Sequence, residues 1–187
     1  MTTYFVAPRI VAGPGAIEQL SALAAKRAVI VVDPALAAAD RHRRLVEELA
    51  KTETVTEIVP GPPSEPTIDS VEALAGRVRS ARPEWIVALG GGRTIDAAKA
   101  AWVRYAHPDV PLGSVTPLVD LQLRSAARFV AVPTTTGSGC DAAWTALVRT
   151  AGGDPVEVAS RELVPDWSLL DPSLPESLPL SVLVGSV

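Results

Sequence analysis

Short apolar segments that alternate with alanine-rich stretches constrain the fold of this chain more than any other feature. Segments bounded by polar residues in this way are typical of strands buried on both faces of a sheet. They are residues 28–32, 54–59, 85–89 and 129–132. A helix between two such strands forms a crossover that makes the strands parallel. The alternation therefore predicts a parallel sheet covered by helices.

The spacing of apolar residues predicts helices in the intervening stretches, over residues 35–51, 67–81 and 92–105. Aromatic residues make up only 4% of the chain, so the core must be built from Ala, Val, Leu and Ile. Such a core suits close packing of helices on a sheet. We predict an α/β fold, Rossmann-like and doubly wound, with a mainly parallel sheet and helices on both faces.

Two stretches interrupt this alternation. Residues 107–125 contain scattered Pro and Gly without a clear period, which predicts a surface excursion. After Pro133 the pattern indicates a β-hairpin over 144–150 and 156–159, joined by the turn-forming residues 152–155. Residues 168–170 read as one more short strand.

Composition narrows the classes of partner. The chain is 48% hydrophobic and 20% charged with a net charge of -4, so it is globular and has no basic surface for nucleic acid. Arg41, Arg43 and Arg44 precede two glutamates, and we interpret them as a solvated helix face. A single cysteine, no secretory signal pattern and no apolar run of about 18–20 residues predict a cytoplasmic protein without a membrane partner.

The strongest local motif is WIVALGGGRTIDAAK, residues 85–99. It places three glycines between a buried strand and a helix. Glycine lets an anion approach the backbone, and a helix N-terminus offers free N–H groups and partial positive charge. The motif therefore favours a phosphate site at Gly90–Gly92, although three glycines could also form only a tight turn. It is neither a G-x-G-x-x-G fingerprint nor a P-loop.

A second motif, AVPTTTGSGCD, follows the strand at 129–132. Thr134, Thr135, Thr136 and Ser138 bring four hydroxyls to the carboxyl edge of the sheet, where open α/β folds bind ligands. The alternative is a turn whose hydroxyls bond to their own backbone.

Taken together, these two motifs resemble those of the iron-containing (group III) alcohol dehydrogenases, which belong to the dehydroquinate synthase-like superfamily. The family pattern is approximately G-G-G-S-x-x-D-x-x-K followed by P-T-T-x-G-T-G-S-E, and here it reads GGGRTIDAAK and PTTTGSGCD. FVAPRIVAGPGAIEQL resembles the family's entry hairpin and first helix. LVPDWSLLDPSLPESLP resembles the exit from its nucleotide domain.

The resemblance implies that Gly90, Gly91 and Gly92 hold a dinucleotide pyrophosphate. It also implies that Thr134, Thr135 and Ser138 line the nicotinamide-side phosphate and ribose. Asp33 matches an acidic position near the adenosine ribose, where a carboxylate accepts from the 2′-OH and repels a 2′-phosphate, favouring NAD over NADP. A helix N-cap ahead of Pro34 is the alternative role of Asp33.

Asp96 and Lys99 match family positions on the helix after the glycines, and Asp96 is a candidate cofactor-binding residue. Their i,i+3 spacing also allows a surface ion pair, which we expect for Lys99.

Several positions depart from the family pattern. Arg93 replaces a small Ser and could bind phosphate or crowd it. Glu65 replaces an Asn, Cys140-Asp141 replaces Ser-Glu, and no lysine follows Lys99.

The resemblance also implies an Fe or Zn ion, bound in a helical C-terminal domain by an Asp and several His. We expect no metal ligands in this chain, because its only histidines, His42 and His107, lie apart without ligand spacing. We accordingly assign residues 1–177 to a dinucleotide-binding domain. Residues 178–187 are assigned to the start of a helical metal-binding domain, the rest of which is missing from this chain.

The implied reaction is hydride transfer between NAD(P) and a small alcohol, aldehyde or ketone, with catalytic residues unknown. Alternatives are a truncated or degenerate nucleotide-binding module, and a polyol-phosphate dehydrogenase or dehydroquinate synthase-like relative. The resemblance further suggests a homo-oligomer or association with the missing C-terminal half.

Overall fold

A six-stranded sheet forms the centre of the computed structural model, which describes residues 7–175. Its strand order is β1-β8-β5-β4-β2-β3, and every pairing in it is parallel. The strands are β1 (Arg9–Ala12), β2 (Arg27–Val32), β3 (Val55–Pro60), β4 (Trp85–Gly90), β5 (Arg128–Pro133) and β8 (Trp167–Leu170). The predicted parallel sheet is confirmed, and the predicted strands match β2, β3, β4, β5 and β8.

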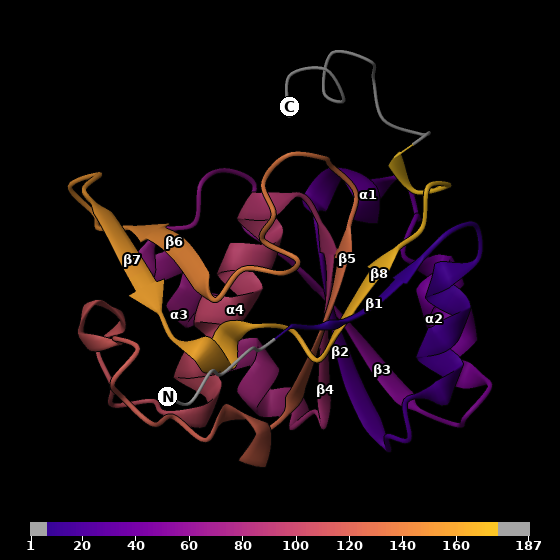
Figure 1. Ribbon diagram of the computed structural model, residues 1–187, viewed down its shortest axis with the longest axis horizontal. Coiled ribbons are helices and arrows are strands. Elements are labelled where there is room, and N and C mark those ends of the chain that lie inside the picture. Colours follow the sequence, from indigo (N-terminus) through magenta and orange to yellow (C-terminus); the bar gives the residue numbers. More distant parts are fainter. Residues whose placement is uncertain (1–6, 176–187) are drawn as a thin grey trace, which may run out of the picture.

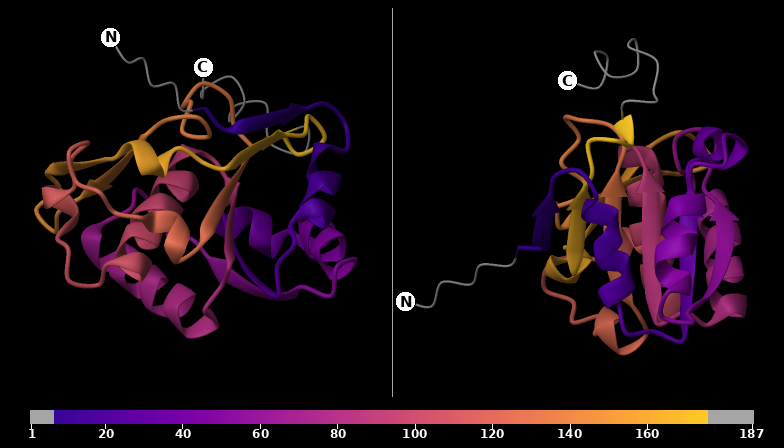
Figure 2. Two further views of the ribbon diagram at one scale, coloured as in Figure 1. Left: turned by 60° about the horizontal axis from the view of Figure 1, so that its bottom comes forward. Right: turned by 90° about the vertical axis from the view of Figure 1, so that its right-hand side faces the viewer.

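Helices cover both faces of the sheet, as Figures 1 and 2 show. The helices are α1 (Pro34–Ala38), α2 (Arg43–Ala50), α3 (Ile68–Ala81) and α4 (Gly92–Ala106), with the 3-10 helices η1 (Ala16–Ala22), η2 (Leu112–Ser114), η3 (Leu123–Ser125) and η4 (Arg161–Leu163). Helices α3 and α4 pack on one face, whereas η1, α1 and α2 pack on the other. The doubly wound α/β fold is therefore confirmed.

Alternation along the buried strands divides the core into two layers. Val29 and Val31 of β2 face the α3–α4 layer, whereas Ile30 and Val32 face η1 and α2. In the first layer Trp102 stacks on Phe129, with ring centroids 5.3 Å apart. The Trp102 indole N–H donates to the Ala127 carbonyl at 3.1 Å. One aromatic pair thus fills the space that small side chains leave around it.

The single helix predicted over 35–51 is wrong, because α1 ends at Ala38 and α2 begins at Arg43. Asp40 adopts a left-handed conformation with φ 55°. The Asp40 N–H donates to Ala37 O and the Arg41 N–H to Leu36 O, which is a Schellman termination. The Asp40 carboxylate then pairs with Arg43 at the start of α2. The polar run over residues 40–44 was interpreted as the solvated face of one continuous helix, and this hid the turn.

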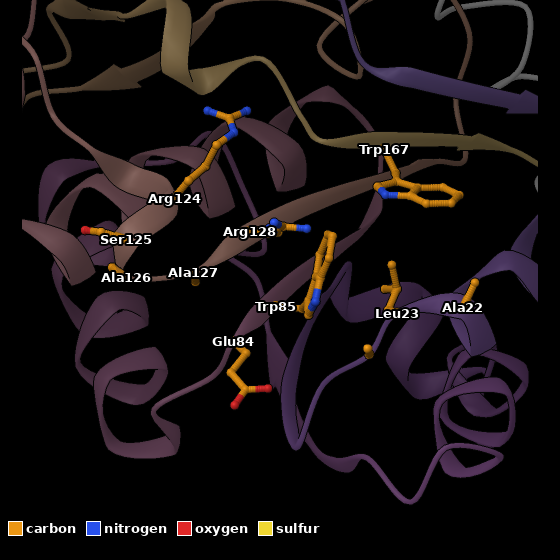
Figure 3. A pocket seen from close by; sticks show the side chains of 11 residues that line it. Ala22, Leu23, Glu84, Trp85, Arg124, Ser125, Ala126, Ala127, Arg128 and Trp167 are labelled. Atoms are coloured by element: carbon orange, nitrogen blue, oxygen red, sulfur yellow. The ribbon is translucent and has the colours of Figure 1, made fainter.

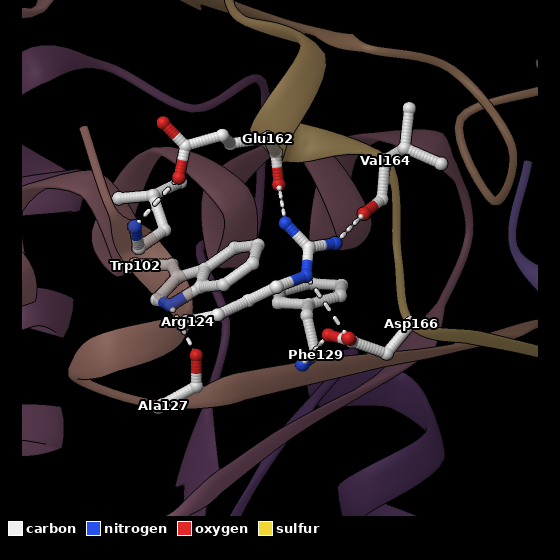
Figure 4. A network of polar contacts seen from close by, with 8 residues as sticks. Trp102, Arg124, Ala127, Phe129, Glu162, Val164 and Asp166 are labelled. Atoms are coloured by element: carbon white, nitrogen blue, oxygen red, sulfur yellow. Dashed lines mark hydrogen bonds and ion pairs between the residues drawn. The ribbon is translucent and has the colours of Figure 1, made fainter. Parts of the chain in front are cut away.

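The hairpin prediction is confirmed by β6 (Thr145–Arg149) and β7 (Pro155–Ala159), which pair antiparallel beside α4. The excursion over residues 107–125 contains η2 and η3 and is held in place by polar contacts (Figure 4). Arg124 donates to the carbonyls of Glu162 and Val164 and pairs with Asp166. The Glu162 carboxylate accepts from the backbone N–H groups of residues 121–123. These contacts dock the excursion on the segment before β8.

Both ends of the chain fall outside the described residues. The predicted entry hairpin begins at residue 5, within the undescribed residues 1–6, and its described part, β1, pairs in parallel with β8. The proposed start of a further domain, residues 178–187, is likewise not described. Within residues 7–175, no helix combines the length and apolarity needed to cross a membrane.

Asp171, at the end of β8, connects the two ends of the described chain. Its carboxylate accepts from the Gly15 N–H at 3.0 Å and from the Ser173 N–H and hydroxyl at 3.0 and 2.7 Å. Burial disfavours the charged form of Asp171, but these hydrogen bonds and one from the Ile17 N–H outweigh burial and lower the pKa. The charged carboxylate therefore stabilises the β1–η1 turn.

We predict that Asp171→Asn lowers the free energy of unfolding by about 1–3 kcal/mol at pH 7, because charge-assisted hydrogen bonds are lost. A lowered folded-state pKa gives stability that is present above the unfolded value of about 3.9 and lost as pH falls through the folded pKa. The difference between wild type and variant should therefore shrink in acid. Urea unfolding at pH 7 and pH 3 measures it, and a difference independent of pH would contradict the assignment.

Candidate functional site

The sheet changes its winding direction between β2 and β4. The chain passes from β2 outward to β3 through α1 and α2, and then returns past β2 to β4 through α3. Ligands bind outside the carboxyl ends of the strands at such a point in open α/β sheets. The Asp33 N–H donates to Leu89 O at 2.9 Å, so the ends of these two strands lie side by side. Asp33 and Gly90, both predicted site residues, end those strands.

Gly90–Gly92, the glycine turn, joins β4 directly to α4. Gly90 has φ +158°, and a Cβ there would lie 2.7 Å from the Thr94 hydroxyl and 2.8 Å from the Thr94 Cβ. Gly91 is the N-cap of α4, and no side chain caps the helix. The first turn of this 15-residue helix therefore keeps its N–H groups for another acceptor.

The Thr/Gly loop, residues 134–140, packs directly on the glycine turn. The Thr134 N–H donates to Gly90 O at 3.1 Å. A Cβ on Gly91 would lie 3.0 Å from the Thr135 hydroxyl, and one on Gly92 would lie 3.0 Å from the Ser138 Cβ. The two motifs, some 40 residues apart in sequence, thus form one surface at the carboxyl edge of the sheet.

Asp33 caps a helix, as the alternative interpretation expected. Its carboxylate accepts from the Ala35 N–H at 2.9 Å, with Pro34 at the first helical position of α1. The Thr94 hydroxyl lies 3.5 Å from the other carboxylate oxygen. Capping engages one oxygen strongly and leaves the second facing the glycine turn through only a long contact.

Two of the residues that depart from the family pattern, Arg93 and Glu65, meet beside the start of α4. Arg93 is exposed on the first turn, and it lines a cavity of about 60 Å³ together with Glu65, Asp96 and Arg149. Arg149 of β6 pairs with Glu65 and lowers the pKa of that carboxyl through a hydrogen bond. Arg93 adds a weaker lowering of the Glu65 pKa through its charge. The helix start is therefore flanked by two guanidiniums and one carboxylate.

The surface ion pair expected for Lys99 is wrong, because Lys99 is fully buried. Its ammonium donates to the carbonyls of Ala143 and Thr145 at 2.6 and 3.3 Å. Asp96 is largely buried, accepts from the Leu147 N–H at 3.2 Å, and has its pKa raised by burial. One signal could have indicated the burial of Lys99: its neighbours along α4 are almost all alanine.

Two cavities that sequence reasoning did not anticipate flank the Thr/Gly loop. One, of about 510 Å³, lies between the loop and the hairpin and is lined by Asp96, Ser138, Cys140 and Glu157 among others. The other, of about 280 Å³, is lined by residues 133–136 and the segment after β8. The predicted residues Asp96, Thr134, Thr135 and Ser138 therefore line open cavities on either side of the loop.

A third cavity, of about 470 Å³, opens at the amino edge of the sheet (Figure 3). Trp85, Trp167, Arg124 and Arg128 line it, with the Arg128 guanidinium 5.5 Å from the Trp85 ring centroid. None of the predicted site residues lies there. It is at the opposite end of the strands from the glycine turn.

Metal binding has no counterpart among residues 7–175. No three His, Cys, Asp or Glu side chains of this region come together as a ligand set. His107 is partly buried, and its ring contacts the Leu121 carbonyl. The described residues therefore do not fit a catalytic metal ion.

Comparison with protein families identifies the fold and its motifs. The family model of the iron-containing alcohol dehydrogenases matches residues 7–172. This chain belongs to the iron-containing alcohol dehydrogenase family. A probable alcohol dehydrogenase of Salmonella typhimurium is 32% identical to it over 185 residues, with 96% of this chain and 46% of the relative covered. An NADPH-dependent butanol dehydrogenase of Clostridium saccharobutylicum is 30% identical, covering 94% of this chain and 46% of the relative.

Solved structures of the family share this fold. The iron-containing alcohol dehydrogenase of Thermococcus thioreducens superposes with a TM-score of 0.89 at 25% identity, over 98% of this chain and 50% of that one. The chain spans about half the length of the relatives it matches.

We predict that Gly90→Ala lowers the free energy of unfolding by about 2–4 kcal/mol, because the new methyl group overlaps Thr94 and the backbone φ is unfavourable. Gly76→Ala in α3 is the matched control, since a Cβ there meets no atom within 4 Å. Within a helix this exchange should raise stability by about 0.5–1 kcal/mol. Urea denaturation of both variants measures the contrast, and equal effects would contradict it.

Proposed function

We propose that this chain binds NAD and forms the cofactor-binding part of an oxidoreductase that interconverts a small alcohol and an aldehyde or ketone. The observation that carries the proposal is the packing of the Thr/Gly loop on the glycine turn. The packed loop lies beside an uncapped helix N-terminus at the point where the sheet reverses its winding. Membership of the alcohol dehydrogenase family supports the class of reaction.

The pyrophosphate is assigned to the glycine turn. Gly91 and Gly92 allow close approach of a phosphate, and the uncapped N–H groups of α4 can donate to it. Arg93 lies on the same first turn, where a guanidinium can bind phosphate oxygens. Because Arg93 is exposed, its side chain can bind phosphate without crowding the glycine turn, which was the alternative effect of replacing Ser by Arg.

The two ends of the dinucleotide are assigned to either side of the turn. Asp33 is placed to accept from the adenosine ribose hydroxyls through the oxygen that does not cap α1. Thr134, Thr135 and Ser138 are assigned to the nicotinamide side, and Asp96 faces the adjoining cavity. When bound, NAD supplies the carbon that accepts a hydride. The chain's own residues bind and orient that cofactor and shield it from water.

The Asp33 carboxylate favours NAD over NADP, because it would repel a 2′-phosphate. A relative is named as NADPH-dependent, so family membership alone does not determine which dinucleotide binds. The preference for NAD is therefore argued from Asp33. Residues 7–175 bring together no metal ligands, and we assign this part of the chain no metal-dependent step. The oligomeric state expected from the resemblance stays a prediction.

A non-catalytic dinucleotide-binding module is the second candidate. The pairing of Glu65 with Arg149 favours it, since this ion pair occupies the side of the helix start where the family pattern has a neutral Asn. Titration of the chain with NADH, followed by nicotinamide fluorescence, tests binding. Alcohol-dependent reduction of NAD by the protein expressed from its own gene, with Fe²⁺ or Zn²⁺ supplied, tests turnover. Binding without turnover would support the module, and absence of binding would contradict both candidates.

We predict that Asp33→Asn shifts dinucleotide preference toward NADPH by on the order of 10-fold. Removing the charge relieves a repulsion of about 1 kcal/mol or more. Asn keeps the N-cap acceptor, so stability should be nearly unchanged. Asp33→Ala should shift preference similarly and also lower stability by about 1 kcal/mol through loss of the cap. Kd values for NADH and NADPH measure the shift, and unchanged ratios in both variants would rule out this role for Asp33.

A further inference from the structure

Lys99 is the largest charged side chain buried in the described core. It lies on α4, two turns beyond the glycine turn, and its ammonium reaches across to the chain that leaves the Thr/Gly loop. There it donates to the carbonyls of Ala143 and Thr145, on either side of Trp144. A single side chain thus connects the helix that begins at the glycine turn to the segment that ends the loop.

The titratable groups that act electrostatically on this ammonium come from two segments. Asp96 lies one turn earlier on α4, whereas Cys140 and Asp141 belong to the end of the Thr/Gly loop and the residue that follows it. Burial lowers the pKa of Lys99 to about 8, against the attraction of these groups. Burial also raises the pKa of the Cys140 thiol to about 11, so the thiol is neutral at pH 7. Lys99 is therefore a cation at neutral pH, and it loses its charge in a pH range that binding experiments can reach.

We propose that Lys99 is a positioning residue, whose ammonium holds the Thr/Gly loop against the first turn of α4 and thereby sets the affinity of the site for a dinucleotide. The inference rests on the proposed function. Cys140 transmits the position, because its sulfur would lie 3.3 Å from a Cβ on Gly92. Displacement of the 140–145 segment would therefore move the loop relative to the glycine turn.

The charge of Lys99 has opposite effects on affinity and on stability. A charged ammonium makes stronger hydrogen bonds to the Ala143 and Thr145 carbonyls than a neutral amine does, so the hold on the loop, and with it the affinity, should fall as pH rises through about 8. The folded-state pKa lies below the unfolded value of about 10.4. Between these two values the unfolded chain binds more protons, and the contribution of Lys99 to stability therefore rises with pH. A residue with only a structural role would show the second effect and not the first.

Lys99→Met tests the proposal, with Val103→Ala as the matched control one turn further along α4. Val103 is fully buried, and its truncation destabilises the same helix without removing the donor. We expect Lys99→Met to weaken NADH binding about 10-fold at pH 7, a loss of about 1.4 kcal/mol, and to abolish the fall in affinity between pH 7 and 9.5. Val103→Ala should retain that fall. Equal affinities and equal pH profiles in the two variants would overturn the proposal.

Hydrogen exchange of the chain without cofactor separates this inference from the proposed function. Lys99→Met should accelerate exchange in residues 134–146 relative to β2 and β4, whereas Val103→Ala should not. If wild type binds no NADH, the proposed function fails. Unchanged exchange in Lys99→Met would then also overturn the inference that Lys99 holds the Thr/Gly loop in place. If Lys99→Met does not fold, Lys99→Gln, which keeps an N–H donor without the charge, should show intact loop protection and a flat pH profile.

Discussion

The contact between the glycine turn and the Thr/Gly loop depends on the absence of side chains at Gly91 and Gly92, and the turn itself on the absence of one at Gly90. A Cβ at Gly90 would overlap Thr94, and those at Gly91 and Gly92 would press on Thr135, Ser138 and Cys140. This close approach occurs where the ends of β4 and β5 pair, at Gly90 and Pro133. It leaves the start of α4 without a side-chain cap. The packing of the loop and the exposure of the helix N-terminus therefore have one cause.

Local patterns predicted most of the fold, because buried parallel strands and their crossover helices carry their signal within a few residues. β2 and β4 are apolar runs, α3 begins with a capping box at Thr67, and the hairpin follows from turn residues. The break between α1 and α2 could not be predicted in the same way, since the polar run over residues 40–44 fits a solvated helix face as well as a turn. The break depends on the left-handed conformation of Asp40 and its pairing with Arg43.

The candidate site was predictable where residue type determines the role and not where it depends on distant packing. Glycines after a buried strand indicated the turn, whereas the interest of Asp33 came from the family resemblance. The burial of Lys99 depends on a hairpin some 45 residues downstream, so i,i+3 spacing with Asp96 suggested a surface pair instead. The larger cavity beside the loop likewise arises from the placement of that hairpin against α4.

A hydrophobic side chain at position 99 would avoid the cost of burying a charge and would pack equally well against the alanines of α4. It would leave the register between α4 and β6 open, because apolar contacts tolerate sliding that a pair of hydrogen bonds to the Ala143 and Thr145 carbonyls does not. The lowered pKa of Lys99 and the raised pKa of Asp96 both record the cost of this arrangement. The chain thus accepts unfavourable burial of charge two turns from the glycine turn, where a defined position of the loop matters most for a site formed by two separate segments.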